Sequence, residues 1–351
     1  MTEQRRHTGY DILRFASIFM VVAIHANVSF LAQNPGSVPW FLVMLFTALC
    51  TLSVPLFFML SGALLLERKE PVSLKEVYLK RIFKQAVPFV LWSVIYVAAR
   101  IVMGKIPFSF GSFASLLWEP AYYQFWFMYT LLAIYLLLPI LQALVKDLSK
   151  RLLEYALLLW FLFAIAVPTI SYIVPQFSIS SHVDLILCEG YIGYFLLGHY
   201  LHKYCADVSV KKAAAAAVTG IAIVFAGALT EWFLCFADTY EGYFYKSYLT
   251  PGVALGASGV FLLFQNGKFS FGGKAKKTIT LLSENALGVY YIHMLVLTAL
   301  EYTVFKQETL LLLAGKVLSV VAGSLLLSFI FQKLPVINIL LFGKTVRKRG
   351  G

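Results

Sequence analysis

The chain has 351 residues, of which 60% are hydrophobic and only 13% are charged, and its formal net charge is +12. Soluble domains are typically about 45–50% apolar and about 25% charged, so this composition excludes an ordinary soluble domain and indicates a polytopic protein of the lipid bilayer. The Lys and Arg residues are dispersed between apolar stretches, which argues against a nucleic-acid-binding surface. We expect an all-α membrane helix bundle.

About ten transmembrane helices are predicted from the apolar stretches. The expected spans are residues 10–31, 39–66, 83–103, 123–145, 152–174, 183–203, 213–236, 248–266, 279–303 and 309–333. The first stretch is too long for a signal peptide and lacks a small-residue cleavage site, so we expect it to remain as a span. Because the connecting segments are short, residues 1–351 are expected to form one transmembrane domain with short basic tails.

The first span contains three ionisable residues, Asp11, Arg14 and His25, which are costly within a membrane and usually line a cavity or pair with each other. Arg14 and His25 are eleven residues apart, so they lie within ~20° of the same helix face and ~16 Å apart along the axis. Asp11 and Arg14 are spaced i,i+3, where opposite charges can meet. Arg14 alone could extend to the interface, and His25 could simply bond a neighbouring helix. We interpret Asp11 as a helix-start carboxylate, and Arg14 with His25 as a functional stripe.

The segment from Glu67 to Lys84 is the most basic part of the chain and carries Lys80, Arg81 and Lys84 about one helix turn apart. These cations either fix topology and contact lipid headgroups, or they clamp a phosphate-bearing ligand; the sequence leaves both interpretations open. Nearly all Lys and Arg outside the spans fall on the same side as this segment. Both termini are therefore expected to be cytoplasmic.

The following spans offer weaker candidates. Ser61 stands beside Gly62 within a span, which indicates close helix packing or a kink beside a cavity. Trp126 and Tyr129 begin the fourth span, as in an aromatic interface belt, although such rings also suit the apolar face of a sugar. Two further intramembrane ionisable residues are Glu189 and His293. The four cysteines have no metal-ligand spacing, so we predict neither a disulfide nor a metal site.

Taken in order, these segments resemble the acyltransferase 3 family of bacterial integral membrane O-acyltransferases. The resemblance rests on DxLR followed by ten residues and His, on PLFFMLSG, on the basic run before the third span, and on WFMYTLLAIYLLLPIL and YYIH. It covers essentially the whole chain. Its most specific part is Arg14-x10-His25, which matches the family's Arg/Lys-x10-His motif. The family's cytoplasmic Arg-x-x-Arg corresponds to Arg81-x-x-Lys84, where Lys keeps the charge but loses the bidentate fork.

The resemblance implies that His25 is catalytic and that Arg14 is essential beside it. Arg81, Lys84 and Lys80 are implied to bind the phosphates of acyl-CoA, which would be a co-substrate, with acetyl-CoA the expected form and no permanently bound cofactor. The acceptor is implied to be a glycan or lipid-linked sugar outside the bacterial cytoplasmic (inner) membrane. Many relatives carry an additional extracellular hydrolase-like domain, and this chain is expected to act without one. A homo-oligomer is left open.

The sequence alone also leaves two other kinds of function open. The protein could transport lipid-linked sugars, with the charged stripe as a gated path, or it could be a non-catalytic partner of a glycan synthase. The absence of an internal repeat weakens the transporter reading. For the enzyme, His25 could act as a general base on the acceptor hydroxyl or as a nucleophile that accepts the acyl group.

Overall fold

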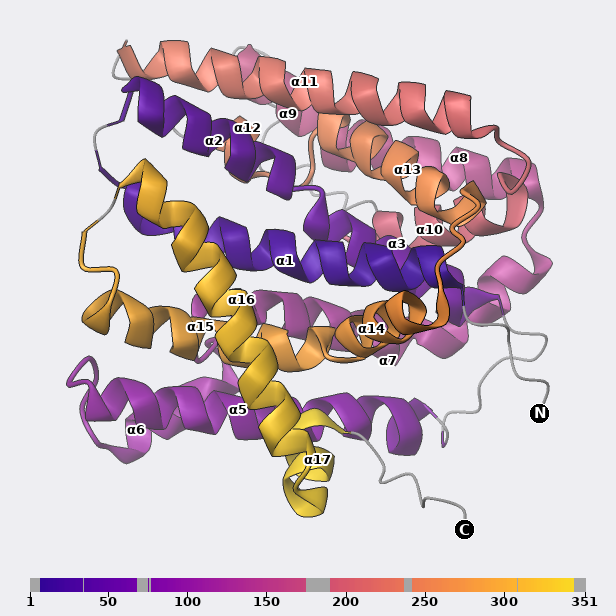
Figure 1. Ribbon diagram of the computed structural model, residues 1–351. Helices are drawn as coiled ribbons and strands as arrows, with labels where there is room; N and C mark the ends of the chain where they lie inside the picture. The colour runs from indigo at the N-terminus through magenta and orange to yellow at the C-terminus, as the bar shows by residue number, and fades with distance from the viewer. Residues whose placement is uncertain are drawn as a thin grey trace.

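The computed structural model describes residues 7–33, 35–67, 75, 77–174, 190–236, 242–307 and 309–343, and every regular element in these ranges is a helix (Figure 1). The elements, in chain order, are α1 (Thr8–Leu31), α2 (Val38–Cys50), α3 (Ser53–Leu66), η1 (Val77–Ile82), α5 (Phe83–Val102), α6 (Phe110–Ala114), η2 (Ser115–Leu117), η3 (Tyr123–Phe125), α7 (Trp126–Asp147), α8 (Lys150–Trp160), η4 (Phe161–Ala166), α9 (Val167–Ile173), α10 (Ile192–Tyr204), α11 (Val210–Phe236), α12 (Tyr243–Lys246), α13 (Pro251–Asn266), α14 (Gly273–Glu284), α15 (Ala286–Thr303), α16 (Leu310–Gln332) and α17 (Pro335–Phe342). The predicted all-α fold is confirmed.

Eight helical stretches of the described chain are long and apolar enough to cross a membrane, and a ninth arises if the bent pair α14 and α15 crosses as one. These nine correspond to nine of the ten predicted spans. The remaining predicted span, residues 183–203, lies partly outside the described residues, and α10 covers its second part. The protein is therefore a multi-pass membrane protein.

Hydroxyl side chains mark where several of these helices begin. Each accepts a hydrogen bond from a backbone N–H in the first turn, which would otherwise have no partner inside the helix. The capping residues are Ser37 before α2, Ser149 before α8, Thr250 before α13 and Thr309 before α16. Because the caps lie at the edges of apolar stretches, the predicted boundaries of these spans are close to the observed ones.

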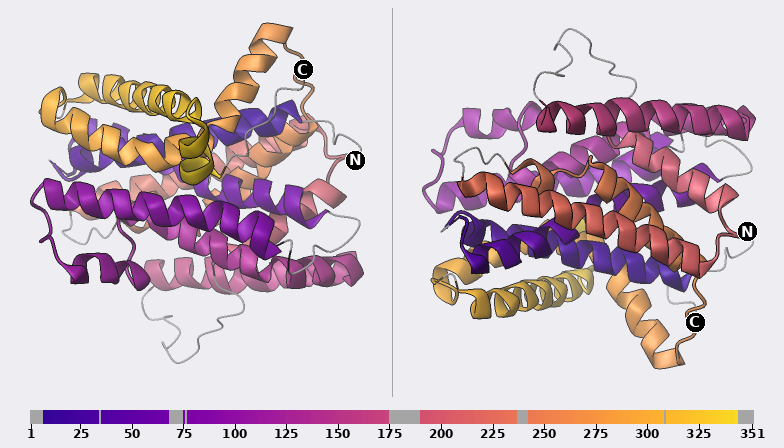
Figure 2. Two further views of the ribbon diagram at one scale, coloured as in Figure 1. Left: turned by 90° about the horizontal axis from the view of Figure 1, so that it is seen from below. Right: turned by 90° about the horizontal axis from the view of Figure 1, so that it is seen from above.

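Helix α1 runs through the middle of the bundle (Figures 1 and 2) and packs against α2, α3, α13, α14, α15 and α16. Its apolar side chains form part of the main core, and Leu13, Val22 and Ala26 are fully buried. A membrane helix that is enclosed on several sides can keep polar residues only if they meet partners or line a cavity. The position of α1 therefore makes its polar residues the natural place to look for a site.

The predicted span 279–303 is not a straight helix. It is divided at Asn285 into α14 and α15, which are bent by 62°. The buried Asn285 amide donates to the Leu281 carbonyl, while its oxygen accepts hydrogen bonds from Ser328 Oγ and Gln332 Nε2 of α16. Side-chain bonds of this kind compensate for backbone bonds interrupted at a kink. As a result, α14 packs on the beginning of α1 and α15 on its second half.

The predicted span 39–66 is likewise divided, because α2 ends at Cys50 and α3 begins at Ser53. Helix α3 then packs closely on α10. A side chain at Gly62 would place its Cβ 1.7 Å from the backbone oxygen of Phe195, and one at Gly198 would place it 2.0 Å from that of Met59. Glycine is required at both positions by this approach, so Gly62 serves helix packing.

Candidate active site

His25 lies in the second half of α1, half-buried beside two aromatic rings. The ring centroid of Tyr123 is 5.0 Å from that of His25, in an edge-on arrangement, and the ring centroid of His293 is 5.2 Å away. His25 also lines a cavity of about 20 Å³ together with Trp126 and Gln124. A cavity of this size has room for about one water molecule. The predicted catalytic histidine therefore faces an enclosed space within the bundle.

His293, the weaker candidate from the sequence, is brought directly to His25. It is fully buried, and its Nδ1 lies 2.7 Å from the Tyr290 carbonyl and 3.1 Å from the Val289 carbonyl. Because a carbonyl oxygen only accepts hydrogen bonds, Nδ1 carries the proton and Nε2 presents a lone pair. Nε2 is buried and has no hydrogen-bond partner among the described residues. The site thus contains two imidazoles, one with a free acceptor nitrogen.

Gln124 is a site residue that the sequence analysis did not identify. Its side chain is buried and lines the cavity at His25 close to the Tyr96 hydroxyl, and neither amide atom meets the geometry of a hydrogen bond with a described residue. The backbone holds it in place, since Tyr290 Oη donates to the Gln124 carbonyl at 2.8 Å. Burying an unpartnered amide is costly, so such a group is a candidate for contact with a substrate. An isolated Gln in the aromatic run from Tyr122 to Phe127 was the available signal.

Arg14 belongs to a polar cluster near the beginning of α1. Its guanidinium donates to Ser283 Oγ at 2.9 Å and lies 3.4 Å from the buried carboxylate of Asp11, and Ser283 Oγ donates to the same carboxylate at 2.8 Å. Asp11 is thus an ion-pair partner as well as a first-turn carboxylate. Since Arg14 meets α14 while His25 meets α15, both lie on the face of α1 that packs on the bent pair. This arrangement is consistent with the common face that the helical spacing predicts.

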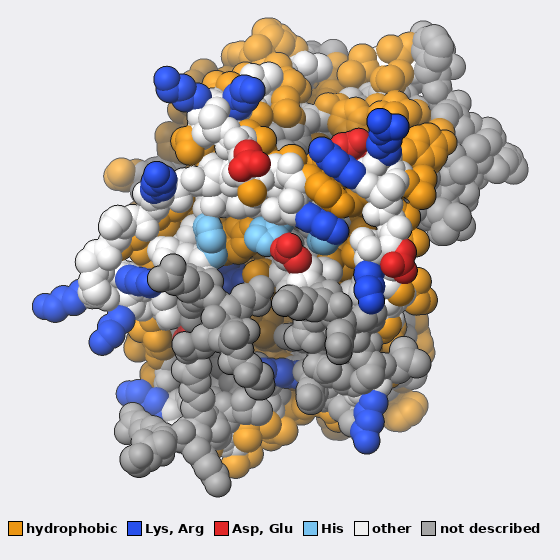
Figure 3. All heavy atoms as spheres, turned by 90° about the vertical axis from the view of Figure 1, so that its right-hand side faces the viewer, with side chains coloured by type: hydrophobic (Ala, Val, Ile, Leu, Met, Phe, Trp, Pro, Cys, Tyr) orange, Lys and Arg blue, Asp and Glu red, His pale blue; other side chains and the backbone are white. Residues whose placement is uncertain are grey.

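A second network joins four segments at the same end of the bundle, which we call the basic end. Tyr10 Oη lies 2.6 Å from His202 Nδ1 and donates to Gln265 Oε1 at 2.9 Å, and His202 Nε2 lies 2.6 Å from Glu67 Oε2. Figure 3 looks onto this end and shows histidine side chains near its centre, with Lys and Arg scattered around them. The network ties the beginning of α1 to α10 and α13, and thereby supports the position of Arg14.

The predicted phosphate-binding cations are only partly described. Lys80 and Arg81 lie in the short helix η1, and their side chains are outside the described residues. Lys84 is exposed in the first turn of α5, where its carbonyl lies close to Gly343. The shared helical segment is consistent with cations one turn apart. Their role in ligand binding stays a prediction.

The structure places the remaining predicted site residues in different surroundings. Trp126 lines the cavity at His25, and its ring centroid is 5.0 Å from that of Tyr191. Tyr129 lines neither this cavity nor the pocket described below, and its hydroxyl donates to the Leu116 carbonyl of a surface segment. The position of Tyr129 therefore fits the aromatic interface belt better than a binding site. Ser61 is half-buried next to the packing residue Gly62, and Glu189 lies outside the described residues.

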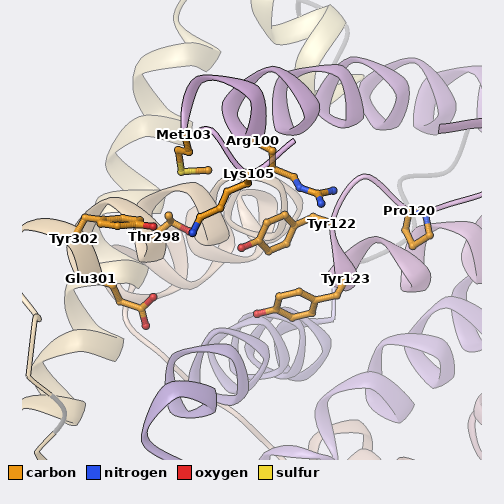
Figure 4. A pocket seen from close by; sticks show the side chains of 9 residues that line it. All are labelled: Arg100, Met103, Lys105, Pro120, Tyr122, Tyr123, Thr298, Glu301 and Tyr302. Atoms are coloured by element: carbon orange, nitrogen blue, oxygen red, sulfur yellow. The ribbon is translucent and has the colours of Figure 1, made fainter. Parts of the chain in front are cut away.

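At the far end of the bundle, opposite the basic end, a pocket of about 700 Å³ opens between α5, α15 and the segment before η3 (Figure 4). Tyr123 lines this pocket and also contacts His25, so one side chain separates the pocket from the imidazole. On the opposite wall, Glu301 accepts hydrogen bonds from Ser29 Oγ and from the fully buried Lys316, each at 3.2 Å. A Lys within an apolar span was the available signal for this ion pair.

Together, the two imidazoles, the unpartnered amide and the pocket form the candidate site. Among the described residues, no group of three or more His, Cys, Asp or Glu is arranged to hold a metal ion. Comparison with protein families matches the acyltransferase domain of the acyltransferase 3 type over residues 7–332. No curated protein and no solved structure matches the chain. Because the family match includes both His25 and the far-end pocket and extends over nearly all of the sequence, the protein belongs to the acyltransferase 3 family.

Proposed function

We propose that the protein transfers an acyl group, acetyl in the first instance and succinyl as the alternative, from cytoplasmic acyl-CoA to a hydroxyl of an envelope glycan or lipid-linked sugar outside the bacterial inner membrane. Family membership supports acyl transfer in general. The observation that carries the specific proposal is the position of His25, between the polar cluster of the basic end and the pocket of the far end. A reaction between substrates that arrive from opposite sides needs its catalytic group at such a point.

The donor side of the proposal depends on charge. Coenzyme A is highly anionic through its phosphates, and the basic end holds Lys80, Arg81 and Lys84 on one helical segment. These cations would hold the phosphates, so that the pantetheine arm extends along α1 past Arg14 toward His25. The ion pair of Arg14 with Asp11 keeps the guanidinium at the side of this route.

Two routes for the chemistry fit the site. As a general base, an imidazole nitrogen of His25 takes the proton of the acceptor hydroxyl, the oxygen bonds to the thioester carbonyl carbon, the C–S bond breaks, and the CoA thiolate receives the proton. As a nucleophile, the nitrogen bonds to the carbonyl carbon and releases the thiolate, and the acceptor oxygen then takes the acyl group from the imidazole. Either route uses the neutral imidazole of His25.

Both routes pass through a tetrahedral intermediate with negative charge on the former carbonyl oxygen. The Gln124 amide lines the same cavity as His25 and has no hydrogen-bond partner in the described residues. Its N–H groups are therefore suited to stabilise that oxygen, as donors do in an oxyanion hole. We assign Gln124 this role.

The cavity at His25 is too small for a thioester and a sugar hydroxyl together. The helices around it must therefore separate when substrates bind, and the aromatic side chains that line it, including Trp126 and Phe127, are the ones that must move. A closed resting site has a chemical advantage, because it keeps water away from the thioester.

The proposal is tested with purified protein in lipid vesicles that contain labelled acetyl-CoA on one side and glycan on the other. Wild-type protein is expected to label the glycan, and His25→Ala to lose about 10²–10⁴-fold in turnover with the fold intact. A transporter would instead move solute without forming an acyl ester, and a scaffold would tolerate His25→Ala. Substantial turnover in folded His25→Ala protein would contradict the assignment and direct attention to His293 and Glu189.

A further inference from the structure

The far-end pocket carries two cations in a region where basic residues are scarce. We propose that this pocket selects an anionic acceptor, namely a glycan whose sugar unit bears a carboxylate or a phosphate close to the hydroxyl that receives the acyl group. The inference rests on the proposed function, because it takes the far-end pocket as the acceptor side. It is carried by Arg100 and Lys105, neither of which the family resemblance marks as functional.

The end of α5 is built so that these two cations face the same space. Gly104 has a left-handed backbone conformation, with φ of +68°, and two hydrogen bonds close the turn: Lys105 N–H donates to the Arg100 carbonyl at 2.8 Å, and Gly104 N–H donates to the Ile101 carbonyl at 2.9 Å. This pair of bonds is the Schellman motif, which reverses the chain at a helix end. The reversal brings Lys105 back beside the last turn of α5, so both residues line the pocket.

The two cations are held differently. The half-buried guanidinium of Arg100 donates to the Ala121 carbonyl at 3.0 Å, which fixes it on the pocket wall. A guanidinium has five N–H donors, so others remain for a ligand. The exposed ammonium of Lys105 has no side-chain partner in the part of the chain that the structure describes, and it extends toward Thr298 and Tyr302 in Figure 4. A fixed fork and a movable point charge together suit a carboxylate or a phosphate.

The carboxylate on the facing wall does not cancel this charge. Glu301 is already paired with the buried ammonium of Lys316 and accepts a hydrogen bond from Ser29. The two charges of that pair offset each other, so the pocket lining keeps the positive charge of Arg100 and Lys105. Under the positive-inside rule, Lys and Arg are scarce at the non-cytoplasmic end of a membrane protein, which is where we expect this pocket to lie. Two of them in one pocket therefore call for a local partner, and an anionic ligand supplies it.

The rest of the lining fits a sugar. The rings of Tyr122, Tyr123 and Tyr302 border the pocket, and Figure 4 shows Tyr122 and Tyr123 on the same side of it. Aromatic faces pack against the apolar face of a sugar ring, while the volume of about 700 Å³ lies within the usual range for small-ligand sites. Tyr123 is the side chain that also meets His25. An acidic sugar bound by the cations would thus present a neighbouring hydroxyl toward the imidazole.

Binding is measured first, without turnover, using His25→Ala protein in nanodiscs and three fluorescent oligosaccharides of equal length: a neutral glucan, an oligogalacturonate and a phosphorylated glucan. We expect the acidic oligomers to bind at least tenfold more tightly than the glucan, and added salt to weaken them because it screens the attraction. Lys105→Ala and Arg100→Gln are each expected to weaken acid binding about tenfold. Lys306→Ala is the matched control, since Lys306 is an exposed cation outside the pocket lining.

Two results would overturn the inference: glucan binding as tight as acid binding, or equal effects of Lys105→Ala and Lys306→Ala. Preference for the galacturonate would assign the anion as a carboxylate, and preference for the phosphorylated glucan would assign it as a phosphate; either supports the inference. Wild-type protein then receives acetyl-CoA. Efficient transfer to the neutral glucan would refute the inference and leave the proposed function intact. Cation-dependent acid binding without transfer to any oligosaccharide would refute the function and leave the anion site intact.

Discussion

At the scale of single residues, the polar side chains on and around α1 fall into two kinds. Asp11 and Arg14 are bonded to each other and to Ser283, so their polar groups already have partners within the protein. The Gln124 amide and His293 Nε2, in contrast, are buried near His25 with no hydrogen-bond partner among the described residues. Buried polar atoms are normally satisfied. We propose that a substrate supplies the missing partners of these two groups beside His25.

Replacing Gln124 by Met removes the proposed oxyanion donor and keeps the side-chain volume nearly unchanged. We expect Gln124→Met to lower kcat about 10²-fold, because a single oxyanion donor contributes about that much, with little change in the KM for acyl-CoA. Steady-state acyl transfer in vesicles provides the measurement. Gln142→Met is the matched control, since Gln142 is a buried amide of α7 that donates to the Leu65 carbonyl and does not line the cavity. Equal losses of kcat in both variants would contradict the assignment.

Arg14 allows charge to be separated from geometry. If its role is electrostatic, Arg14→Lys keeps the positive charge and is expected to retain more activity than Arg14→Ala, although it loses the planar guanidinium, whose Nη1 reaches both Asp11 and Ser283. Arg14→Ala also removes the Arg14 cation from the buried Asp11 carboxylate, so its melting temperature is expected to fall further. Acyl transfer and thermal unfolding are measured for the wild-type, Arg14→Lys and Arg14→Ala proteins to separate the two effects. Equal, complete inactivation by both substitutions with unchanged melting would point to the fork itself.

At the scale of elements, the bend between α14 and α15 allows one segment to support both ends of the site. Asn285→Ala removes the acceptor of Ser328 Oγ and one acceptor of Gln332 Nε2, and we expect it to lower the free energy of unfolding by about 1–3 kcal/mol, because the buried Ser328 hydroxyl loses its acceptor. Ser328→Ala removes only one of the donors and is expected to cost less. Thermal unfolding in detergent compares them. A neutral Asn285→Ala would mean that the bend does not depend on this amide.

These elements also show which structural features could be predicted from the sequence. The common face of Arg14 and His25 was predictable because it depends only on helical periodicity, and the spans were predictable from their length and hydropathy. The bend at Asn285 was not, since its partners lie about forty residues further along the chain. For the same reason, the contact of Tyr123 with His25 and the Schellman turn that pairs Lys105 with Arg100 became visible only after the helices were packed.

At the scale of the whole molecule, the polar groups form a sequence from one end of the bundle to the other. It runs from the Tyr10 network through Arg14 to His25 and Tyr123, and then to the far-end pocket. A membrane protein buries such groups only at considerable cost. Their alignment around one central helix supports a reaction that connects the two sides, with the direction of transfer determined by which end faces the cytoplasm.

The orientation of the bundle is therefore the prediction on which the direction of transfer depends. The basic end is expected to be cytoplasmic, since Lys and Arg are retained on that side. In a background in which Cys50, Cys188, Cys205 and Cys235 are replaced, we expect Lys105→Cys to react with a membrane-impermeant maleimide in intact cells. Lys277→Cys, an exposed position of α14, is expected to react only after permeabilisation. Acyl transfer by the cysteine-free protein is the control for folding. The opposite labelling pattern would place the far-end pocket in the cytoplasm, where it would face the donor, and would reverse the assignment of donor and acceptor sides.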